Sequence, residues 1–514
     1  MHKIELNQQF KTALDLIEKT SESVFVTGKA GTGKSTLLTY LQDVTKKSMV
    51  VLAPTGVAAL NVLGETIHSF FRFKPNVTVE EAKKAARKVK DNDLYKNIDL
   101  IVIDEISMVR ADLLDCVDVF LRAVLRKREP FGGIKMVFIG DMYQLPPVLT
   151  RQDKEHFDAF YESPYFFSSQ VMTHGKLKLH FVELEKIYRQ SDQCFIELLN
   201  AIRNNSVNDE QLAVLNRRVD PECSKNDRGS IYLTTTNKGA DEINSRKLSR
   251  LKVKPATFEA DVYGDFDLKL APAPVELNLK AGAQVMFQNN NPEGLWVNGT
   301  IGTVKAVDDS EIKVITRDGF LVSVGRYKWT LYKYSFDTKT RTLLQESIGT
   351  FTQYPLKLAW AVTIHKSQGK TFNKVIIDLG HGTFAHGQSY VAFSRCQSLD
   401  GLILKKPLKK GHVMMDYRVV KFLTRFQYDL SEEKCSTDEK VNIIKEVIKS
   451  GERLAITYLK PNDQKSSRNI KPISVGDMEY LGKTYLGMEA WCMTQQSVRV
   501  FRVDRILEIK KITK

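Results

Sequence analysis

The sequence predicts an α/β protein with two doubly wound lobes, in which helices flank parallel sheets. Short β-branched runs alternate with helix-length amphipathic stretches through most of the chain, as in sheets with crossover helices. The chain has 514 residues, which is too many for one compact core. Two segments break the alternation with closely spaced turn residues, which predicts small β-rich units added to the lobes.

The first lobe is predicted at residues 1–190 and the second at 191–430. Buried strands of the first sheet are expected at 23–27, 49–53, 100–103 and 136–139. Between the last two runs, Leu114, Val117, Leu121 and Val124 recur at helical spacing, which predicts a crossover helix. Strands of the second sheet are expected at 231–234, 283–287, 374–379 and 401–404.

Two insertions and a C-terminal unit complete the predicted organisation. A segment at about 74–97 contains a capping box, Thr78-Val79-Glu80-Glu81, that opens a helix. From about 296 to 354, turns such as Asn298-Gly299 separate short alternating runs, which predicts a small β-barrel inserted in the second lobe. Residues 431–434 have the composition of a linker, and 431–514 are expected to form a separate β-rich domain.

The composition excludes several classes of protein. The formal net charge of +15 and the pI of about 9.2 suit a polyanionic partner, nucleic acid before acidic lipid. No apolar run approaches the ~20 residues of a membrane span, so no membrane partner is expected. The six cysteines lie far apart and contain no CxxC pair, which favours a reducing cytoplasm over a disulfide framework or a zinc site.

The strongest motif is a phosphate-binding loop. Residues 28–35 read GKAGTGKS, which matches G-x-x-x-x-G-K-[ST] between a predicted strand and a predicted helix. Glycines let backbone N–H groups wrap phosphates, and the helix N-terminus adds positive potential. Lys34 is expected to neutralise the β- and γ-phosphates, and the Ser35 hydroxyl to ligate Mg²⁺. The predicted nucleotide-binding residues here are Gly28, Ala30, Gly31, Thr32, Gly33, Lys34, Ser35 and Thr36.

Polar residues also follow two other predicted strands of the first lobe. Asp104 and Glu105 come directly after the run 100–103, where Asp104 can hold Mg²⁺ and Glu105 can polarise the attacking water as a general base. Gln144 follows the run 136–139 and is expected near the γ-phosphate, where its amide can orient water. An ordinary solvated loop glutamine is the alternative interpretation of Gln144.

Seven motifs occur in an order that resembles the superfamily-one helicases, and among them the PIF1-like (petite integration frequency) family, relatives of the bacterial RecD helicases. The resemblance covers about residues 1–425. The motifs are 28–35, 53–59, 104–105, 140–147, Tyr188-Arg189-Gln190, 363–369 and 390–395.

This resemblance implies an ATP- and Mg²⁺-dependent DNA helicase with two RecA-like lobes, which moves 5′→3′ on single-stranded DNA and unwinds forked or tailed duplexes. Arg189 and Arg395 match the family's arginine fingers, which reach the γ-phosphate from the second lobe, and Gly369 belongs to the same nucleotide-binding set. The adenine-reading glutamine of many members is replaced by Phe10, so Gln8 or Gln9 is expected to substitute.

The resemblance also implies which residues grip the strand. The segment 74–97 takes the place of the family's wedge, and the inserted barrel that of its SH3-like subdomain. Of Phe70 and Phe71, one is expected to be buried. The predicted DNA-binding residues are Pro54, Thr55, Gly56, His68, Ser69 and Phe70 in the first lobe and Thr363, His365 and Lys366 in the second.

The C-terminal residues resemble the WYL domain, a small SH3-like β-unit, although Thr484 stands where that family has tryptophan. Such domains bind nucleic acid or nucleotide-like ligands and regulate their hosts. The chain is expected to act as a monomer in the bacterial cytoplasm or nucleoid. A nucleotide-switched nucleic-acid clamp, a RecD-like recombination helicase and a small-molecule kinase are the alternatives.

Overall fold

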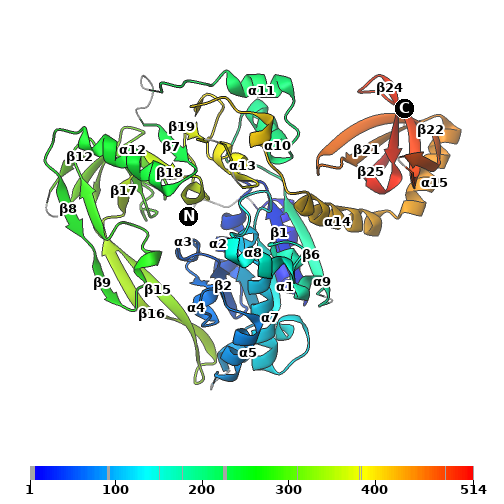
Figure 1. Cartoon of the computed structure of the whole chain (residues 1–514). Helices are drawn as coiled ribbons and strands as arrows, with labels where there is room; N and C mark the ends of the chain where they lie inside the picture. The colour runs from blue at the N-terminus through cyan, green and yellow to red at the C-terminus, as the bar shows by residue number, and fades with distance from the viewer. Residues whose placement is uncertain are drawn as a thin grey trace. The chain divides into compact units, whose positions relative to one another are not determined.

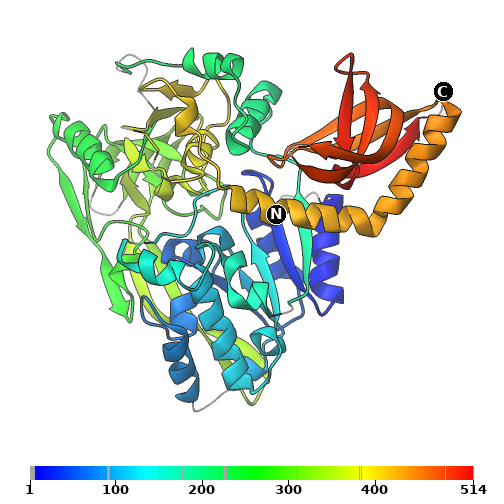
Figure 2. The ribbon, with the colours of Figure 1, turned by 45° about the vertical axis from the view of Figure 1, so that its right-hand side comes forward.

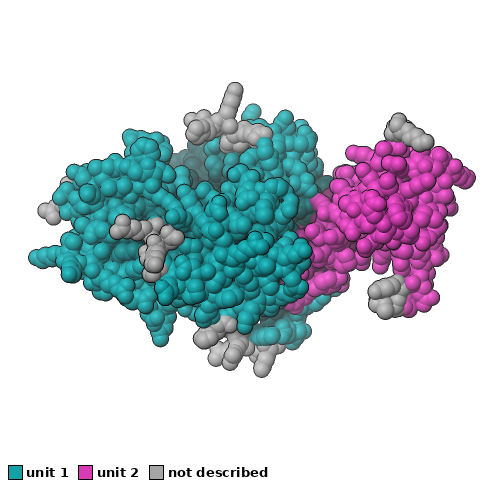
Figure 3. All heavy atoms as spheres, turned by 90° about the horizontal axis from the view of Figure 1, so that it is seen from above, with its two compact units in different colours: residues 1–203, 207–414 teal, residues 204–206, 415–514 magenta. Residues whose placement is uncertain are grey.

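The computed structural model describes residues 6–89, 93–149, 151–175, 177–223, 229–308, 311–380, 382–383, 385–480 and 482–512. The chain divides into two compact units, one of Met1–Arg203 with Val207–Met414 and one of Asn204–Ser206 with Met415–Lys514 (Figure 3). Among the described residues, none of the helices combines the length and the apolar character that a membrane span requires.

The first lobe is built on a parallel sheet with the strand order β3-β2-β4-β5-β1-β6 (Figure 1). β1 lies between β5 and β6, with Val24 opposite Val137 and His180. The predicted strands are confirmed to within one residue at each end. The strands are β1 Ser23–Gly28, β2 Met49–Ala53, β3 Glu65–Thr66, β4 Leu100–Ile103, β5 Lys135–Ile139 and β6 Leu179–Leu184.

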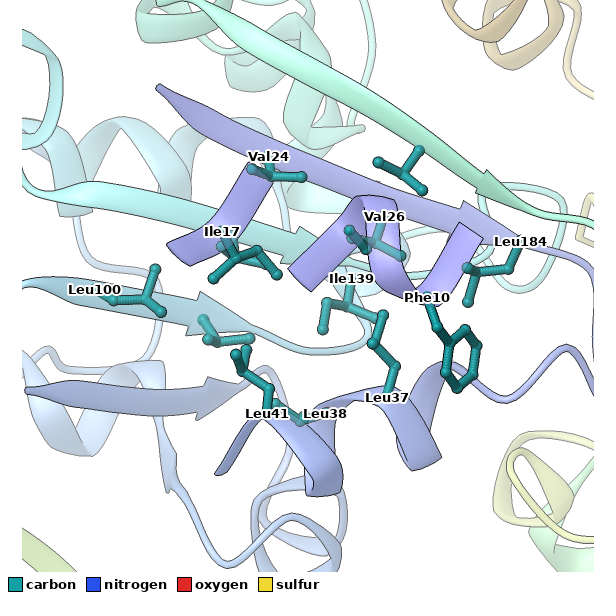
Figure 4. Packing of buried hydrophobic residues seen from close by; sticks show 14 of the residues in the cluster. Phe10, Ile17, Val24, Val26, Leu37, Leu38, Leu41, Leu100, Ile139 and Leu184 are labelled. Atoms are coloured by element: carbon teal, nitrogen blue, oxygen red, sulfur yellow. The ribbon is translucent and has the colours of Figure 1, made fainter. Parts of the chain in front are cut away.

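Helices cover this sheet because their apolar residues recur every third or fourth position. Phe10 and Ile17 of α1 and Leu37 and Leu41 of α2 lie in one buried cluster with Val26 of β1 (Figure 4), and each such side chain contributes about 1.5–3 kcal/mol by leaving water. The helices are α1 Gln8–Lys19, α2 Lys34–Val44, α3 Gly56–Asn61, α4 Ile67–Phe70, α5 Val79–Arg87, α6 Asp93–Lys96, α7 Ala111–Leu125, α8 Arg151–Asp158 and α9 Gln170–Thr173.

Two predicted helices of this lobe are confirmed. The crossover helix is α7, and the capping box at Thr78 and Glu81 opens α5. Residues 90–92 of the expected insertion lie outside the described residues.

The second lobe has a parallel sheet with the order β18-β7-β19-β20. The segment 283–287, predicted as a strand of this sheet, instead forms β11 of an antiparallel sheet, and the unpredicted β18 takes a place beside β7. Both segments are short buried apolar runs, and periodicity alone does not choose their partners. The strands are β7 Ile231–Thr234, β18 Ala361–Thr363, β19 Val375–Asp378 and β20 Leu402–Leu404, and the helices are α10 Gln193–Arg203, α11 Asp209–Asn216, α12 Asn237–Ser249 and α13 Gln388–Phe393.

The inserted β structure extends beyond the expected bounds of 296 and 354. Its antiparallel sheet has the order β14-β13-β12-β11-β17, and a long hairpin, β15–β16, pairs separately with β9. Residues 309–310 lie outside the described residues. The strands are β8 Ala256–Glu259, β9 Asp261–Gly264, β10 Glu276–Leu279, β11 Gln284–Phe287, β12 Ile301–Val307, β13 Ile312–Thr316, β14 Leu321–Val324, β15 Tyr327–Asp337, β16 Thr342–Gln353 and β17 Leu356–Leu358.

The hairpin β15–β16 reaches the first lobe. The Tyr334 hydroxyl accepts a hydrogen bond from the Val51 backbone at 3.1 Å, and the Tyr334 backbone N–H donates to Glu65 Oε2 at 3.3 Å. These bonds attach the inserted β structure to the edge of the first sheet.

The second compact unit is an antiparallel sheet with the order β24-β23-β22-β21-β25, and α15 lies along it (Figure 2). The expected linker at 431–434 is instead the last turn of α14, and the compact unit begins at Met415 rather than at 431. Ser431 belongs to this unit, because its buried hydroxyl lies within hydrogen-bond distance of the Ile506 and Leu507 carbonyls, at 3.0 and 2.9 Å. The elements are α14 Tyr417–Lys434, α15 Thr437–Ser450, β21 Arg453–Leu459, β22 Lys465–Tyr480, β23 Lys483–Cys492, β24 Ser497–Arg502 and β25 Ile506–Ile512. Residues 481, 513 and 514 lie outside the described residues.

Candidate active site

The phosphate-binding loop connects the buried strand β1 to the N-terminus of α2. Gly31 and Gly33 adopt φ angles of 82° and 87°, which favour glycine. Lys34 Nζ donates to the carbonyls of Gly28 at 2.7 Å and Lys29 at 3.0 Å, so its ammonium lies over its own loop. Ser35 and Thr36 are exposed on the first turn of α2, and the loop residues Ala30 and Thr32 are buried.

Two carboxylates lie at the C-terminal end of β4, opposite this loop. Burial, and after it repulsion by Glu105, raises the pKa of Asp104 to about 7. Burial also raises the pKa of Glu105, while Lys34 and then Arg395 act against that rise. Gln368 of the second lobe donates from Nε2 to Glu105 Oε2 at 3.1 Å. Two neighbouring buried acids whose pKa values are raised form a place where a bound metal cation would be favourable.

The donor set fits Mg²⁺. Among the described residues, no three His, Cys, Asp or Glu side chains form a metal-binding group by themselves. Asp104, only 8% exposed, and the hydroxyl of Ser35 are hard oxygen donors. Mg²⁺ usually binds through one or two protein carboxylates together with water and substrate phosphates, so this small set of donors suits the ion.

Gln144 lies in the loop after β5, beside the second lobe. It is 7% exposed, and its Nε2 donates to Asp141 Oδ2 at 3.1 Å. A Cβ on Gly387, just before α13, would collide with the carbonyls of Gln144 and Tyr143, so the second lobe packs closely against this loop. The solvated-loop alternative for Gln144 is therefore wrong.

Arg395 follows α13 and is fully buried, with 1% exposure. Its Nε donates to the Val391 carbonyl at 2.9 Å, and its Nη1 donates to the Lys370 carbonyl at 3.2 Å. Burial, and then the charge of Arg189, lowers the pKa of Arg395 to about 9, while Glu105 opposes this effect. The guanidinium is therefore held rigidly within electrostatic reach of the acids of the first lobe.

Arg189 lies on the first lobe, within the range 1–190 predicted for it, and not on the second lobe, from which the arginine fingers were expected to reach. Its backbone follows β6 of the first sheet, and the neighbouring Tyr188 N–H donates to the Gly31 carbonyl at 2.8 Å. The Arg189 guanidinium donates across to the carbonyls of Ser394 and Gly369, both at 3.4 Å. The reason is the sheet order, because β6 pairs with β1 and so brings the following residues beside the loop that follows β1.

Two interlobe contacts involve residues to which sequence analysis assigned no role. The Ala30 backbone N–H donates to the buried Tyr390 hydroxyl at 2.9 Å, and Gln368 holds Glu105 as described above. Tyr390 lies inside the matched motif 390–395, and Gln368 lies inside the matched motif 363–369. Their places in these motifs were the signal in the sequence that could have identified them.

The expected adenine-reading glutamines lie at the start of α1. Gln8 is exposed, and Gln9 Nε2 donates to Glu185 at 3.4 Å. Phe10 is 2% exposed in the core, and a Cβ on Gly33 would lie 3.0 Å from its ring. Tyr188, which sequence analysis did not assign, offers a 45% exposed aromatic ring beside the same loop.

The structure separates the predicted strand-binding residues of the first lobe into exposed and buried ones. Thr55 and Ser69 are exposed, and His68 is half-buried with its pKa lowered by burial. Phe70 is not available to stack on a base, because its ring packs at 4.9 Å from Phe71 and 5.9 Å from Tyr334. The expectation of one buried phenylalanine is wrong, since both are buried.

Pro54 is half-buried, whereas Gly56 is covered. A Cβ on Gly56 would collide with the side chain of Leu270. Gly56 nevertheless opens α3, where the Thr55 side chain caps the helix by accepting from Ala58 N–H.

The second-lobe residues lie just after β18. Thr363 is 4% exposed, and its hydroxyl accepts a hydrogen bond from the Lys366 backbone at 3.2 Å. Burial lowers the pKa of the half-buried His365, and Lys366 is exposed. These residues continue directly into Gln368 and Gly369 at the nucleotide site.

The chain is similar to known proteins over most of its length. The model of the PIF1-like helicase family matches residues 5–213, and that of the WYL domain matches residues 439–511. The ATP-dependent DNA helicase Pif1 of Bdellovibrio bacteriovorus is 31% identical over 441 residues, which cover 83% of this chain and 93% of that protein. The human ATP-dependent DNA helicase PIF1 is 34% identical over 78% of this chain, which spans 60% of the human protein.

Solved structures agree with the sequence matches. The Bacteroides sp Pif1 structure in complex with ADP-AlF4 has a TM-score of 0.77 at 36% identity, covering 83% of this chain and 98% of that one. Bacteroides Pif1 bound to ssDNA has a TM-score of 0.59 at 36% identity, covering 82% and 96%. With a relative of this identity matched over more than two thirds of its length, the chain belongs to the PIF1-like helicase family.

Proposed function

We propose that the chain is an ATP-dependent DNA helicase that moves 5′→3′ along single-stranded DNA and separates the duplex ahead of it. The observation that carries this proposal is the meeting of the phosphate loop, Glu105 and Arg395 at one site shared by two lobes. A nucleotide bound there interacts differently with the closed and open lobes, which is the requirement for driving movement. The activities named for its relatives, and the ssDNA complex of one of them, support this function.

Hydrolysis begins with charge neutralisation. Lys34 leaves the Gly28 and Lys29 carbonyls to bind the β- and γ-phosphates of ATP. Ser35 and Asp104 are the residues that would hold Mg²⁺. When bound, this ion would supply positive charge that neutralises the phosphates.

The attacking water is activated by Glu105. Its pKa is raised, which suits a group that must take up a proton. Gln368 holds one carboxylate oxygen and leaves the other for the water. We assign the orientation of that water to the Gln144 amide. Both amides are neutral, so they position Glu105 and water without weakening the base.

Arg395 and Arg189 stabilise the negative charge that develops on the transferred phosphoryl group. Planar guanidinium groups remain charged and donate in pairs, and such fingers contribute ~10³–10⁵ in rate in related mechanisms. Both arginines contact carbonyls of the second lobe at Ser394, Gly369 and Lys370. Gly369 and Lys370 follow His365 and Lys366 closely in the chain. Closure of the lobes around ATP therefore moves the segment 365–370 as well.

The strand is held by phosphate contacts and polar groups that do not read sequence. We assign this role to Thr55, His68 and Ser69 on the first lobe and to His365 and Lys366 on the second. The WYL domain at 439–511 is assigned a regulatory or strand-binding role. The helicase acts as a monomer in the bacterial nucleoid.

An unwinding assay on 5′-tailed, 3′-tailed and forked duplexes, with and without ATP, tests the proposal. ATP-dependent separation of the 5′-tailed and forked substrates, with hydrolysis stimulated by single-stranded DNA, is the expected result. Tight strand binding with negligible turnover would instead indicate a nucleotide-switched clamp. Preference for the 3′-tailed duplex would overturn the polarity.

A further inference from the structure

Three lysines converge where the inserted β structure meets the second lobe. Lys357 on β17 is directly opposite Met286 on β11, so the two side chains share one face of that antiparallel pair. Lys370, from the segment after Gly369, places its Nζ 3.4 Å from Met286 Sδ. Lys366 is close enough to Lys357 to affect its pKa.

The acceptors around these ammonium groups are neutral. Lys370 Nζ donates to Asn298 Oδ1 at 2.9 Å and to Gln288 Oε1 at 3.4 Å. Among the described residues, no carboxylate forms an ion pair with Lys357, Lys366 or Lys370. A partly buried group of positive charges without a counter-ion is unfavourable unless an anion joins it.

The pKa values agree with this interpretation. Burial, and then repulsion by Lys366, lowers the pKa of Lys357 to about 8. Burial, and then repulsion by Lys357, lowers the pKa of Lys370 well below its ordinary value. A bound phosphate would oppose both effects.

The position of this cluster links it to both lobes. The Lys370 carbonyl accepts a hydrogen bond from Arg395 Nη1 at 3.2 Å. Asn298 Nδ2 donates to Asn61 Oδ1, at the end of α3 in the first lobe, at 3.2 Å. The cluster also lies on the chain segment that carries His365. An occupant would therefore touch the segment 365–370, whose Lys370 carbonyl is bound by Arg395.

We propose that Lys357, Lys366 and Lys370, with Asn298, form a pocket for one phosphodiester group of single-stranded DNA. The proposal rests on the proposed function, and adds contacts from β17, from the Asn298-Gly299 turn and from Lys370. Arg395 binds the backbone carbonyl of Lys370. A phosphate bound by Lys370 is therefore held by a residue that moves together with an arginine of the nucleotide site.

Salt dependence of strand binding tests the pocket. The affinity of the full-length protein for an oligothymidylate is measured by fluorescence anisotropy over a series of NaCl concentrations, without nucleotide. Each phosphate contact to a single strand contributes about −0.7 to the slope of log affinity against log salt. The double variant Lys357→Met/Lys370→Met is expected to have a slope shallower by about 0.7 and an affinity about tenfold lower at moderate salt.

Two matched variants serve as controls. Lys305→Met removes an exposed lysine from β12 of the same inserted structure and is expected to bind like the wild type. Lys357→Arg keeps the charge and is expected to keep the slope. A double variant with the wild-type slope and affinity would overturn the pocket.

Asn298→Asp provides a second test that does not depend on the stability of the methionine variants. It places a carboxylate in the position that now contacts Lys370 Nζ at 2.9 Å, and so supplies an internal anion that competes with phosphate. We expect a raised melting temperature together with severalfold weaker strand binding. Unchanged or tighter binding would contradict the proposal. If the wild type shows neither strand binding nor DNA-stimulated hydrolysis, the proposed function fails instead.

Discussion

Replacing Asp104 by asparagine is expected to stabilise the nucleotide-free protein at alkaline pH while removing Mg²⁺-dependent turnover. Burial, and then repulsion by Glu105, raises the pKa of Asp104 from 3.8 to about 7, and the side chain is 8% exposed. The folded protein therefore holds this proton more tightly than the unfolded chain does. The free energy of unfolding falls as pH rises from about 4 to about 7, and it stays lower above that range. Asparagine has no proton to lose.

The size of the effect follows from the pKa shift. At about 1.4 kcal/mol per pKa unit, ionised Asp104 costs the folded state on the order of 4 kcal/mol at pH 8. The compact unit has roughly 400 residues, and its unfolding entropy is about 2 cal/mol/K per residue. Dividing the free-energy difference by this entropy gives a melting temperature for Asp104→Asn about 5 °C above that of the wild type. At pH 5, ionisation of Asp104 stabilises the unfolded wild-type chain less than at pH 8. The expected rise in the melting temperature of Asp104→Asn at pH 5 is therefore about 2 °C.

Differential scanning calorimetry of both proteins with EDTA, at pH 5 and pH 8, measures these shifts. Asp43→Asn is the matched control, because Asp43 is exposed on α2, and its substitution is expected to change stability by less than about 0.5 kcal/mol at either pH. The reasoning is refuted if Asp104→Asn melts below the wild type at pH 8, or if its advantage does not grow with pH. Turnover with Mg²⁺ and ATP is expected to fall at least ~100-fold in the same variant.

Three further substitutions probe the nucleotide site. Lys34→Ala should reduce steady-state ATP hydrolysis by ~100-fold or more while strand affinity, measured by filter binding, stays within severalfold; normal hydrolysis would refute the phosphate-loop assignment. Arg395→Ala should lower kcat by ~10³ or more with little change in ATP affinity, and equal losses of both would make it a binding residue only. Tyr390→Phe leaves the Ala30 N–H without its buried acceptor and should lower kcat/KM for ATP about tenfold; an unchanged value would show that this interlobe hydrogen bond does not contribute.

Features specified by neighbouring residues were predictable. The strands β1, β2, β4 and β5 are buried on both faces, so each is a continuous apolar run in the sequence. The capping box at Thr78 and the helix α7 depend on side chains three or four positions apart. Lys34, Asp104 and Glu105 could be found because each follows a strand of one parallel sheet, and such strands end at the same edge.

Features that depend on distant residues were not predictable in the same way. The runs 284–287 and 361–363 are both short and buried, and only their partners decide that the first joins an antiparallel sheet and the second a parallel one. Phe70 lies in a matched motif, yet an aromatic cluster that includes Tyr334 from the inserted hairpin covers it.

By itself, the sequence determined the chemical groups of the nucleotide site, the order of its motifs and the local helices and strands, because these depend on residue type and short spacing. The tertiary structure alone decided which groups meet across the lobes. It placed the Arg189 guanidinium against the Ser394 and Gly369 carbonyls and set Tyr390 against Ala30. It also brought Lys357 and Lys370 together with no carboxylate ion-paired to either among the described residues. The physical reason is that long-range packing, desolvation and charge depend on distances in space, and these are set by the whole fold.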